Sequence, residues 1–412
     1  MSLKLRSKND WGRLDMTSEW NHFALGEITE LVIDYRGKTP KKLGGDWCKQ
    51  GYRALSAKNI KTGRIVQAET IRYIDESLYR KWMKDEVQRG DILITSEAPF
   101  GQIFFWDSDE KIVLSQRLFC VRIKPEYDAR FIYYYMTTPE FQSELDGRAT
   151  GTTVIGLRQP ELMKCIIRCP EIQEQKVIAA ILSSIDAKII ANEKVNDNLY
   201  AQAKAIFDNH FINIDAIPAG WRKGNLLDIA NYLNGLAMQK FRPQGHEIGL
   251  PVLKIKELRQ GSCDDSSELC SLSIKPEYII HNGDVIFSWS GSLLVDIWCG
   301  GTCGLNQHLF KVTSDVYDKW FYYLWTAHHL ARFIAIAADK ATTMGHIKRE
   351  ELAKAEVLIP CEEDYTSFNS IMQPVFELII SNRIESRKLA ALRDELLPKL
   401  MTGEIDVSDV QF

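Results

Sequence analysis

The densest group of side chains with recognisable chemistry in this sequence is basic. Residues 35–66 contain nine Lys or Arg side chains against one acid, Asp46, for a local net charge of +8, and five glycines are interleaved with them. Lys and Arg neutralise nucleic-acid phosphates, and backbone amides exposed at glycines donate hydrogen bonds to phosphate oxygens. The segment therefore predicts a phosphate-binding surface formed by Arg36, Lys38, Lys41, Lys42, Lys58, Lys61 and Arg64.

A second, weaker basic segment occurs later in the chain. Residues 236–260 carry five basic side chains against Glu247 and Glu257, a net charge of +3. A single basic run is more often a solvated face than a binding surface. Its recurrence makes the two interpretations equally strong, and the second set of candidate DNA contacts is Lys240, Arg242, Lys254 and Lys256.

Two short segments of small polar and basic residues each precede a predicted helix. They cover residues 148–153 and 340–346. Threonine hydroxyls, backbone amides and a helix N-terminus can hold a phosphate or approach a base edge. A simple helix cap explains the same residues and, for these segments taken alone, is the stronger interpretation. The candidate base-reading residues are Arg148, Thr152, Thr153, Thr342, Thr343 and His346.

Catalytic motifs are missing from the sequence. Gly37-Lys38-Thr39 resembles the end of a nucleotide phosphate loop, but Val32 stands where that loop needs its first glycine. No Gly-x-Gly-x-x-Gly opens a helix, and neither Gly-x-Ser-x-Gly nor His-Glu-x-x-His occurs. Cys299, Cys303 and His308 lack the spacing of a zinc site. We therefore expect a protein with no catalytic residues and no metal site of its own.

The elements that must position the basic segments are duplicated. Asp128, Phe131 and Tyr133 recur 190 residues later as Asp318, Phe321 and Tyr323, and Pro170 recurs as Pro360. Upstream the spacing drifts, since Gly90-Asp91-Ile92 matches Gly283-Asp284-Val285 at 193. A constant spacing in one half and a variable one in the other indicate a duplicated domain whose front half contains the variable loops.

Each repeat begins with short β-branched and aromatic runs that predict strands. These runs are Asp91–Thr95, Gln102–Trp106, Ile112–Leu114 and Leu118–Ile123 in the first repeat, and Val285–Trp289, Val295–Trp298 and Leu309–Val312 in the second. Aromatic segments follow at 131–136 and 321–325, and we expect helices that pack on the sheets. Base stacking would be an alternative use of those aromatic rings, but a core role is the more common one.

The last part of each repeat shows the period of a long helix with a coiled-coil seam. The seam residues are Ile178, Ile185, Asn192 and Leu199 in the first helix and Val375, Asn382 and Leu389 in the second. Because Asn192 and Asn382 occupy equivalent positions, we hypothesise that their amides satisfy each other. The sequence predicts an antiparallel pair, a rod of about 57 Å for a helix of roughly 38 residues. An ordinary helical core of two adjacent domains is the alternative.

Composition narrows the class of protein. The 412 residues include 51 Lys and Arg against 55 Asp and Glu, so a globally basic surface is excluded but a local basic face is not. The longest apolar stretch, 285–295, is too short to span a membrane. The N-terminus resembles no secretion signal, and nine scattered cysteines argue against a disulfide framework. We expect a cytoplasmic protein with no membrane contact.

The order of strand-rich region, long helix, strand-rich region and long helix resembles the specificity (S) subunit of type I restriction-modification systems. The segments that carry the resemblance are 167–175, in which a proline precedes a Glu-Gln pair that opens a helix, and 396–405, which is similar to the family's C-terminal conserved region. The second repeat departs from this pattern, because Asp364 and Tyr365 replace Glu174 and Gln175.

The resemblance implies an α+β fold with two β-rich target recognition domains separated by a pair of long antiparallel coiled-coil helices, in a pseudo-two-fold repeat. The expected boundaries are a leader at 1–19, recognition domains at 20–165 and 221–355, a central conserved helix at 166–212, a linker at 213–220 and a C-terminal conserved helix at 356–412. The expected partners are double-stranded DNA, two modification (methyltransferase) subunits and restriction (translocase and nuclease) subunits. S-adenosylmethionine, ATP and Mg are expected in those partner subunits and no cofactor in this chain.

The implied function is that of a non-catalytic subunit that reads a bipartite, asymmetric DNA site, with the helices as a ruler between the half-sites. Two alternatives stay open. A self-sufficient DNA methyltransferase or nuclease would be active as the purified chain alone. A coiled-coil scaffold without a DNA function would not retain DNA even with partner subunits present.

Overall fold

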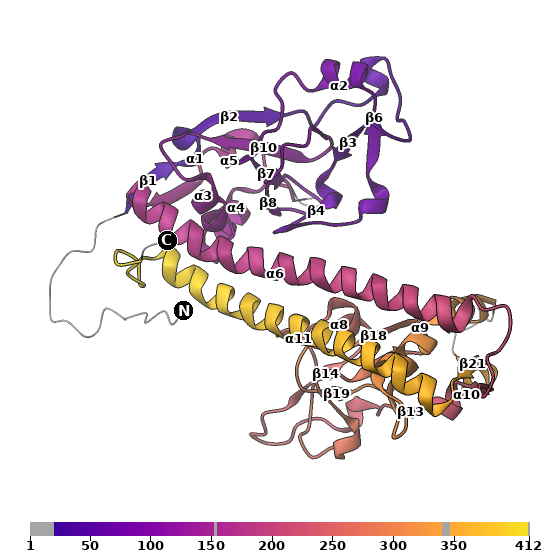
Figure 1. Cartoon of the computed structure of the whole chain (residues 1–412). Helices are drawn as coiled ribbons and strands as arrows, with labels where there is room; N and C mark the ends of the chain where they lie inside the picture. The colour runs from indigo at the N-terminus through magenta and orange to yellow at the C-terminus, as the bar shows by residue number, and fades with distance from the viewer. Residues whose placement is uncertain (1–19, 152–154, 340–346, 411–412) are drawn as a thin grey trace. The chain divides into compact units, whose positions relative to one another are not determined.

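The computed structural model describes residues 20–151, 155–339 and 347–410. The chain divides into two units (Figure 1). Unit 1 contains residues 1–186 and 392–412, and unit 2 contains residues 187–391. The predicted leader at 1–19 lies outside the described residues, as do Thr152, Thr153, Thr342, Thr343 and His346.

Unit 1 is built on an antiparallel sheet of four strands in the order β2–β10–β7–β8. Because successive side chains of a strand point to opposite faces, β7 contributes to two cores. Ile92 and Ile94 pack in the core beneath the aromatic helix α3, whereas Leu93 packs in a second core with Trp82. Both faces of this sheet are therefore covered by protein, which explains its almost continuous hydrophobic strands.

The bounds of the elements in the first repeat follow from these hydrophobic runs and their turns. The strands are β1 (Asn21–Ala24), β2 (Thr29–Asp34), β3 (Tyr52–Leu55), β4 (Ile60–Lys61), β5 (Arg64–Ile65), β6 (Arg72–Ile74), β7 (Ile92–Thr95), β8 (Ile103–Phe105), β9 (Ile112–Leu114), β10 (Leu118–Ile123) and β11 (Ile166–Cys169). The α-helices are α1 (Leu25–Ile28), α2 (Glu76–Trp82), α3 (Ala129–Met136), α4 (Pro139–Arg148), α5 (Gln159–Leu162) and α6 (Ile172–Phe207), and the short 3-10 helices include η2 (Lys41–Leu43) and η3 (Ala57–Asn59).

Unit 2 repeats the same sheet with the order β13–β20–β17–β18. Val285 and Phe287 of β17 face a core with Phe333, and Ile286 faces a second core with Trp298. The internal repeat read from the sequence is therefore a repeat of structure, down to the alternation of β17 between two cores.

The elements of the second repeat follow a similar but not identical order. The strands are β12 (Arg222–Asn225), β13 (Asn231–Asn234), β14 (Leu250–Leu253), β15 (Leu269–Cys270), β16 (Ile279–Ile280), β17 (Val285–Ser288), β18 (Leu294–Ile297), β19 (Cys303–Leu305), β20 (Leu309–Thr313) and β21 (Glu356–Ile359). The helices are α7 (Leu226–Ile229), α8 (Ile255–Gln260), α9 (Lys319–Asp339), α10 (Arg349–Ala353) and α11 (Glu362–Met401), with the 3-10 helices η6 (Met238–Lys240) and η7 (Pro276–Tyr278).

All seven predicted strands are confirmed, six in the two central sheets and Ile112–Leu114 as β9 of a separate three-stranded sheet, and so are helices at the two aromatic segments. The aromatic helix differs between the copies. In unit 1 it is interrupted at Thr137, because Thr138 caps a new helix that begins at Pro139. In unit 2 the corresponding α9 continues unbroken for 21 residues.

The two long helices begin later than residues 166 and 356. Residues 166–169 form β11, which pairs antiparallel with β1, and residues 356–359 form β21, which pairs with β12. A proline follows each strand, and the helices start at Ile172 and Glu362. Each long helix is thus attached to its repeat through a strand that closes a two-stranded sheet.

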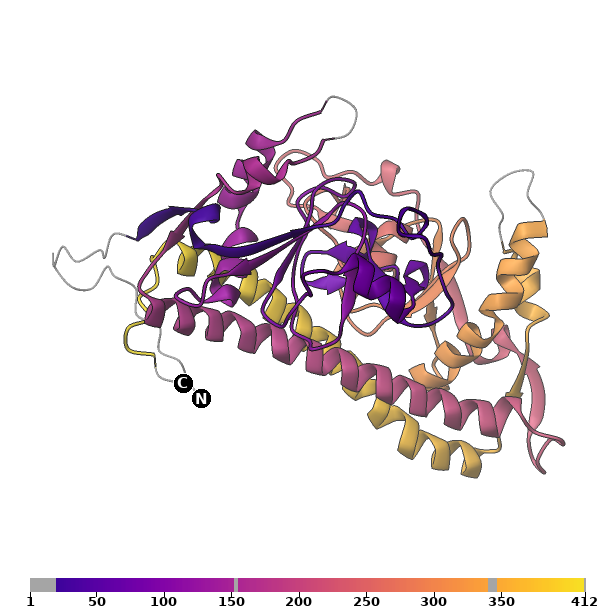
Figure 2. The same ribbon diagram turned by 90° about the horizontal axis from the view of Figure 1, so that it is seen from above.

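Within unit 2, α6 and α11 lie side by side and antiparallel (Figures 1 and 2). Asn192 donates from Nδ2 to Glu385 Oε2 (2.8 Å) and Ser386 Oγ (3.2 Å), while Asn382 donates to Asn196 Oδ1 (2.9 Å). The hypothesis of an Asn192–Asn382 pair is therefore wrong. Asn196, one helical turn after Asn192, is the residue that faces Asn382 in the antiparallel register.

The predicted seam residues lie on the buried side of their helices. Ile178, Ile185 and Asn192 are buried, and Leu199, Val375, Asn382 and Leu389 are half-buried. The seam of unit 1 has one charged contact, from Arg393 Nη1 to Asp186 Oδ1 at 2.8 Å. The fold class is α+β, with two β-rich repeats and two long helices. In the part of the chain that the structure describes, no helix combines the length and apolar character needed to cross a membrane.

Candidate DNA interface

The first basic segment is distributed over several short elements of unit 1. Arg36 follows β2, and its guanidinium donates to Asp34 (Nε–Oδ1 2.8 Å) and lies 4.0 Å from the centre of the Phe119 ring. Lys38 donates to the carbonyl of Trp82 and lies over the Tyr35 ring, at 3.7 Å from its centre. Desolvation by this packing is the first cause that lowers the pKa of Lys38, followed by repulsion from Lys84. Arg36 and Lys38 are thus held in fixed orientations.

The other basic residues of this segment reach solvent. Lys41 and Lys42 lie on η2, Lys58 lies on η3, and Lys61 and Arg64 form the two arms of the β4–β5 hairpin. All five are exposed, and none has a carboxylate partner within the residues that the structure describes. Exposed cations without an internal counterion are the groups that gain most from a phosphate. This part of the surface fits the predicted phosphate contacts.

The corresponding residues of unit 2 are neutralised internally. Arg242 and Lys254 both form ion pairs with Glu268, and Lys256 donates to Ser266 Oγ (2.8 Å) and lies 3.7 Å from Asp264. The hydrogen bond from Lys254, and then that from Arg242, holds the pKa of Glu268 below its ordinary value. Glu268 is therefore ionised at neutral pH. Lys240 on η6 is exposed and, within the described residues, has no such partner.

Arg148, predicted to read a base, is tied to its own helix. Its Nη2 atom lies 2.9 Å from Glu144 Oε1, and Nη1 lies 3.7 Å from Glu161 Oε2. The guanidinium is about one-quarter exposed, and the hydrogen bond with Glu144 is the main cause that raises its pKa. The other predicted base-reading residues, Thr152, Thr153, Thr342, Thr343 and His346, lie outside the described residues.

The described residues that follow the two small polar segments meet the central sheets at equivalent places. In unit 1 the amide of Leu157 donates to the carbonyl of Ser96 (3.0 Å), directly after β7. In unit 2 the amide of Ile347 donates to the carbonyl of Trp289 (3.0 Å), directly after β17. Leu157 and Ile347, which follow the predicted base-reading segments, are therefore bonded to the same end of the equivalent strand in both copies.

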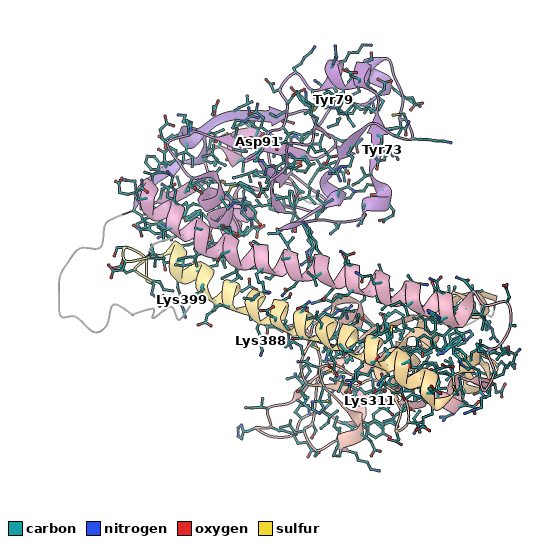
Figure 3. The ribbon with its side chains drawn as sticks, in the orientation of Figure 1. Tyr73, Tyr79, Asp91, Lys311, Lys388 and Lys399 are labelled. Carbon is teal, nitrogen blue, oxygen red and sulfur yellow. The ribbon has the colours of Figure 1, made fainter. Side chains whose placement is uncertain are left out.

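At the other end of the same strands, each sheet is braced by a buried or half-buried acid that no catalytic or binding motif indicated. Asp91 is 1% exposed, and its carboxylate accepts hydrogen bonds from Arg122 (Nε–Oδ1 2.8 Å) and from the amide of Gln88 (2.8 Å). Asp284 accepts from the amide of His281 (2.8 Å) and pairs with Lys311 (2.8 Å). Figure 3 labels Asp91 in unit 1 and Lys311 in unit 2. The repeated Gly-Asp dipeptide before each strand was the signal for this pair.

The described surface carries groups that suit contacts with a nucleic acid. Across residues 20–151, 155–339 and 347–410, no group of three or more His, Cys, Asp or Glu side chains is arranged to hold a metal ion. Exposed lysines without counterions can contact phosphates. Hydrogen-bonding side chains beside a strand end can contact base edges.

The sequence has known relatives. Residues 17–200 match the model of the type I restriction modification DNA specificity domain. The chain is 27% identical over 347 residues to the type I restriction enzyme MjaIX specificity subunit of Methanocaldococcus jannaschii, covering 78% of this chain and 79% of that protein. It is 18% identical to the HindI specificity subunit of Haemophilus influenzae, covering 78% of this chain and 88% of the relative.

A solved structure has the same fold. The S subunit of a type I restriction-modification system from M. genitalium superposes with a TM-score of 0.57 at 15% sequence identity, covering 94% of this chain and 97% of that one. The likeness extends over both repeats and both long helices, so the duplicated α+β architecture is common to the two proteins.

Proposed function

Because the chain belongs to the family of type I restriction-modification specificity subunits, we propose that it is the subunit that reads DNA sequence for such a complex. The single observation that carries the proposal is the duplicated sheet. In both copies a basic segment precedes the central strand, and the residue that follows a small polar segment bonds to the end of that strand, β7 or β17. Each copy reads one half of a bipartite site. The half-sites differ because the exposed side chains of the two copies differ.

In this proposal the exposed lysines neutralise phosphates and the segments 148–153 and 340–346 approach the base edges. Phosphate contacts fix position and register, whereas base contacts carry sequence information. Lys41, Lys42, Lys58, Lys61 and Arg64 make the phosphate contacts of unit 1. Lys240, Arg242, Lys254 and Lys256 make those of unit 2, at a lower net charge.

The long helices are proposed to set the distance between the half-sites. α6 begins in unit 1 and ends in unit 2, and α11 runs back in the opposite sense within each unit. A 36-residue helix extends for about 54 Å, whereas equivalent faces of DNA recur every 34–36 Å or so. A helix of fixed length therefore favours one spacer length.

The partners in this proposal are two adenine methyltransferase subunits and the ATP-dependent nuclease subunits, placed with the DNA in the cytoplasm. The chemistry belongs to those partners, which bind S-adenosylmethionine, ATP and Mg, and this chain contributes no catalytic residue. The enzyme alternative is tested by methyl transfer or DNA cleavage with the purified chain alone, which we expect to be inactive.

The proposal is tested by genome-wide adenine methylation in a host that lacks its own system. The chain is expressed with the modification subunit encoded beside it, and a control strain expresses the modification subunit alone. We expect methylation at a two-part motif with a constant gap, absent from the control. A contiguous motif would contradict two readers. Absence of methylation from an assembled complex would favour the scaffold alternative.

A further inference from the structure

The two copies share a backbone frame at the loop-bearing edge of the sheet, and this frame aligns them residue by residue. Phe119 pairs with Asp34, and Phe310 pairs with Asn234, across equivalent strands. The amide of Ser96 donates to the carbonyl of Arg117 (2.9 Å), and the amide of Trp289 donates to the carbonyl of His308 (3.4 Å). Equivalent positions are therefore identified by hydrogen bonds and do not depend on an alignment of dissimilar loops.

The residues directly beyond these hydrogen bonds form one contact in each copy, with different chemistry. In unit 1, Glu97 Oε1 lies 3.0 Å from Arg117 Nε. In unit 2, Ser290 Oγ lies 2.9 Å from His308 Nδ1. Glu97 corresponds to Ser290, and Arg117 corresponds to His308. An ion pair in one copy thus replaces a neutral hydrogen bond in the other.

A second pair of side chains covers the same aromatic ring in both copies. In unit 1 the Arg36 guanidinium lies over Phe119 and binds Asp34. In unit 2 the Trp289 indole packs on Phe310, with ring centres 5.6 Å apart, and its Nε1 donates to Asn234 Oδ1 (2.9 Å). The underlying phenylalanine is kept, while the residue that lies on it changes from a cation to an indole.

The end of the sheet that carries these contacts is accessible in unit 1, whereas in unit 2 His308 is half-buried and Ser290 is 1% exposed. The side chains of Arg117 and Glu97 are 48% and 36% exposed, and a Cβ atom added to Gly156, at the foot of the segment in unit 1, would lie 3.4 Å from Glu97 Oε2. Arg117 also has a φ of +66°, a conformation that costs energy for a residue with a side chain and that is concentrated at functional sites.

We propose that Glu97 and Arg117 in unit 1, and His308 in unit 2, are specificity-determining residues that read one base pair in each half-site, and that the buried Ser290 (1% exposed) orients the His308 ring. The inference rests on the proposed function and names the residues that perform it. An exposed ion pair exchanges its partner at little cost. Arg117 donates to guanine O6 and N7, and Glu97 accepts from cytosine N4, so unit 1 reads a G·C pair. In unit 2 the half-buried imidazole of His308 takes the place of the Arg117 guanidinium, so this copy selects a different pattern of donors and acceptors.

Arg117→Ala and His308→Ala, each in the full chain with its modification subunit, test the inference through the methylated motif. We expect Arg117→Ala to relax one G·C position of one half-site, with discrimination reduced roughly ten- to hundredfold, and to leave the gap and the other half-site unchanged. His308→Ala is expected to relax one position in the other half-site only. Arg89→Ala is the matched control, because Arg89 is half-exposed but pairs with Asp107 and Asp109 away from this edge.

A second measurement covers the case in which a variant complex methylates too little DNA. The assembled complex is used to retain duplexes from a library that is randomised at the half-site positions, and the retained duplexes are sequenced. Relaxation at one position supports the inference, and an unaltered preference at every position overturns it, as does a change in both half-sites from one substitution. If the unsubstituted chain gives no two-part motif, the proposed function itself fails, which is a separate result.

Discussion

Asp91 and Asp284 stand directly before β7 and β17, and both bind a basic side chain from the neighbouring strand, Arg122 in unit 1 and Lys311 in unit 2. At the other end of the same strands, unit 1 has the Glu97–Arg117 ion pair and unit 2 has the Ser290–His308 hydrogen bond. The start of the two strands has an acid–base pair in both copies (the shared end), whereas their other end has a different contact in each copy (the variable end). Because the shared end stabilises the fold, the variable end can differ between half-sites.

The largest expected effect on stability comes from substitutions at the shared end. Asp91→Ala leaves Arg122 largely buried without its counterion and is expected to lower the free energy of unfolding by about 3–4 kcal/mol. Asp284→Ala is expected to cost about 1–2 kcal/mol, because Asp284 is 21% exposed and Lys311 keeps a hydrogen bond to the carbonyl of Ile279. Urea denaturation followed by tryptophan fluorescence measures both changes.

The control for this pair is Asp109→Ala. Asp109 is 82% exposed, and its ion pair with Arg89 contributes little, so no measurable change in the free energy of unfolding is expected. Equal losses for Asp91→Ala and Asp284→Ala would contradict the view that the more deeply buried acid contributes more to stability.

The seam of unit 2 gives the next largest effect. Asn192 is 3% exposed and donates to two acceptors, whereas its repeat equivalent Asn382 is half-buried and donates to Asn196. Asn192→Ala is expected to cost about 1–2 kcal/mol and Asn382→Ala less, because removal of a buried hydrogen-bonding group costs more than removal of a half-exposed one. Thermal unfolding of the two variants, with exposed Ser381→Ala as the control, measures the difference. A greater loss of stability for Asn382→Ala would contradict the view that the more buried asparagine contributes more.

The strands, the aromatic helices and the seam could be predicted because each is specified by local periodicity. Ile178 and Ile185 recur at seven, and the runs in β7 and β10 are β-branched and apolar. The partner of Asn192 could not be predicted, because the register between two helices depends on how their ends are attached to the sheets. The heptad pattern is satisfied by several registers that differ by one turn.

The candidate interface was predictable only in part, for a related reason. Residues 236–260 carry a net charge of +3, but Glu268 lies outside that window and offsets one of the two charges of Arg242 and Lys254, both of which pair with it. Glu97 and Arg117 are twenty positions apart in the sequence and are ordinary charged residues until β7 and β10 bring them together. Only the fold identifies them as one contact.

The difference in charge between the copies predicts a difference in salt dependence. Lys58→Ala is expected to weaken DNA binding by the assembled complex across all sequences and to reduce the slope of log affinity against log salt by about 1. Lys256→Ala is expected to change that slope by less than half as much, because Asp264 and Ser266 already contact its ammonium group. Filter binding at several salt concentrations measures both slopes, with Lys111→Ala, whose partner is Glu86, as the control. An unchanged slope for Lys58→Ala would remove it from the phosphate contacts.

The smallest expected effect is a gain in DNA affinity. It tests whether unit 2 can be given exposed cations without a counterion, as in unit 1. Glu268→Gln removes the charge that cancels Arg242 and Lys254 but keeps a side chain of the same size. The released cations are expected to strengthen binding a few-fold at low salt and to steepen the salt slope by up to about 1, without altering the methylated motif. Glu277→Gln is the matched control, an exposed acid of unit 2 to which the structure gives no basic partner among its described residues. If Glu268→Gln changed the motif instead, Glu268 would belong with the base-reading residues, and the division between a charged front and a reading edge would have to be redrawn for this copy.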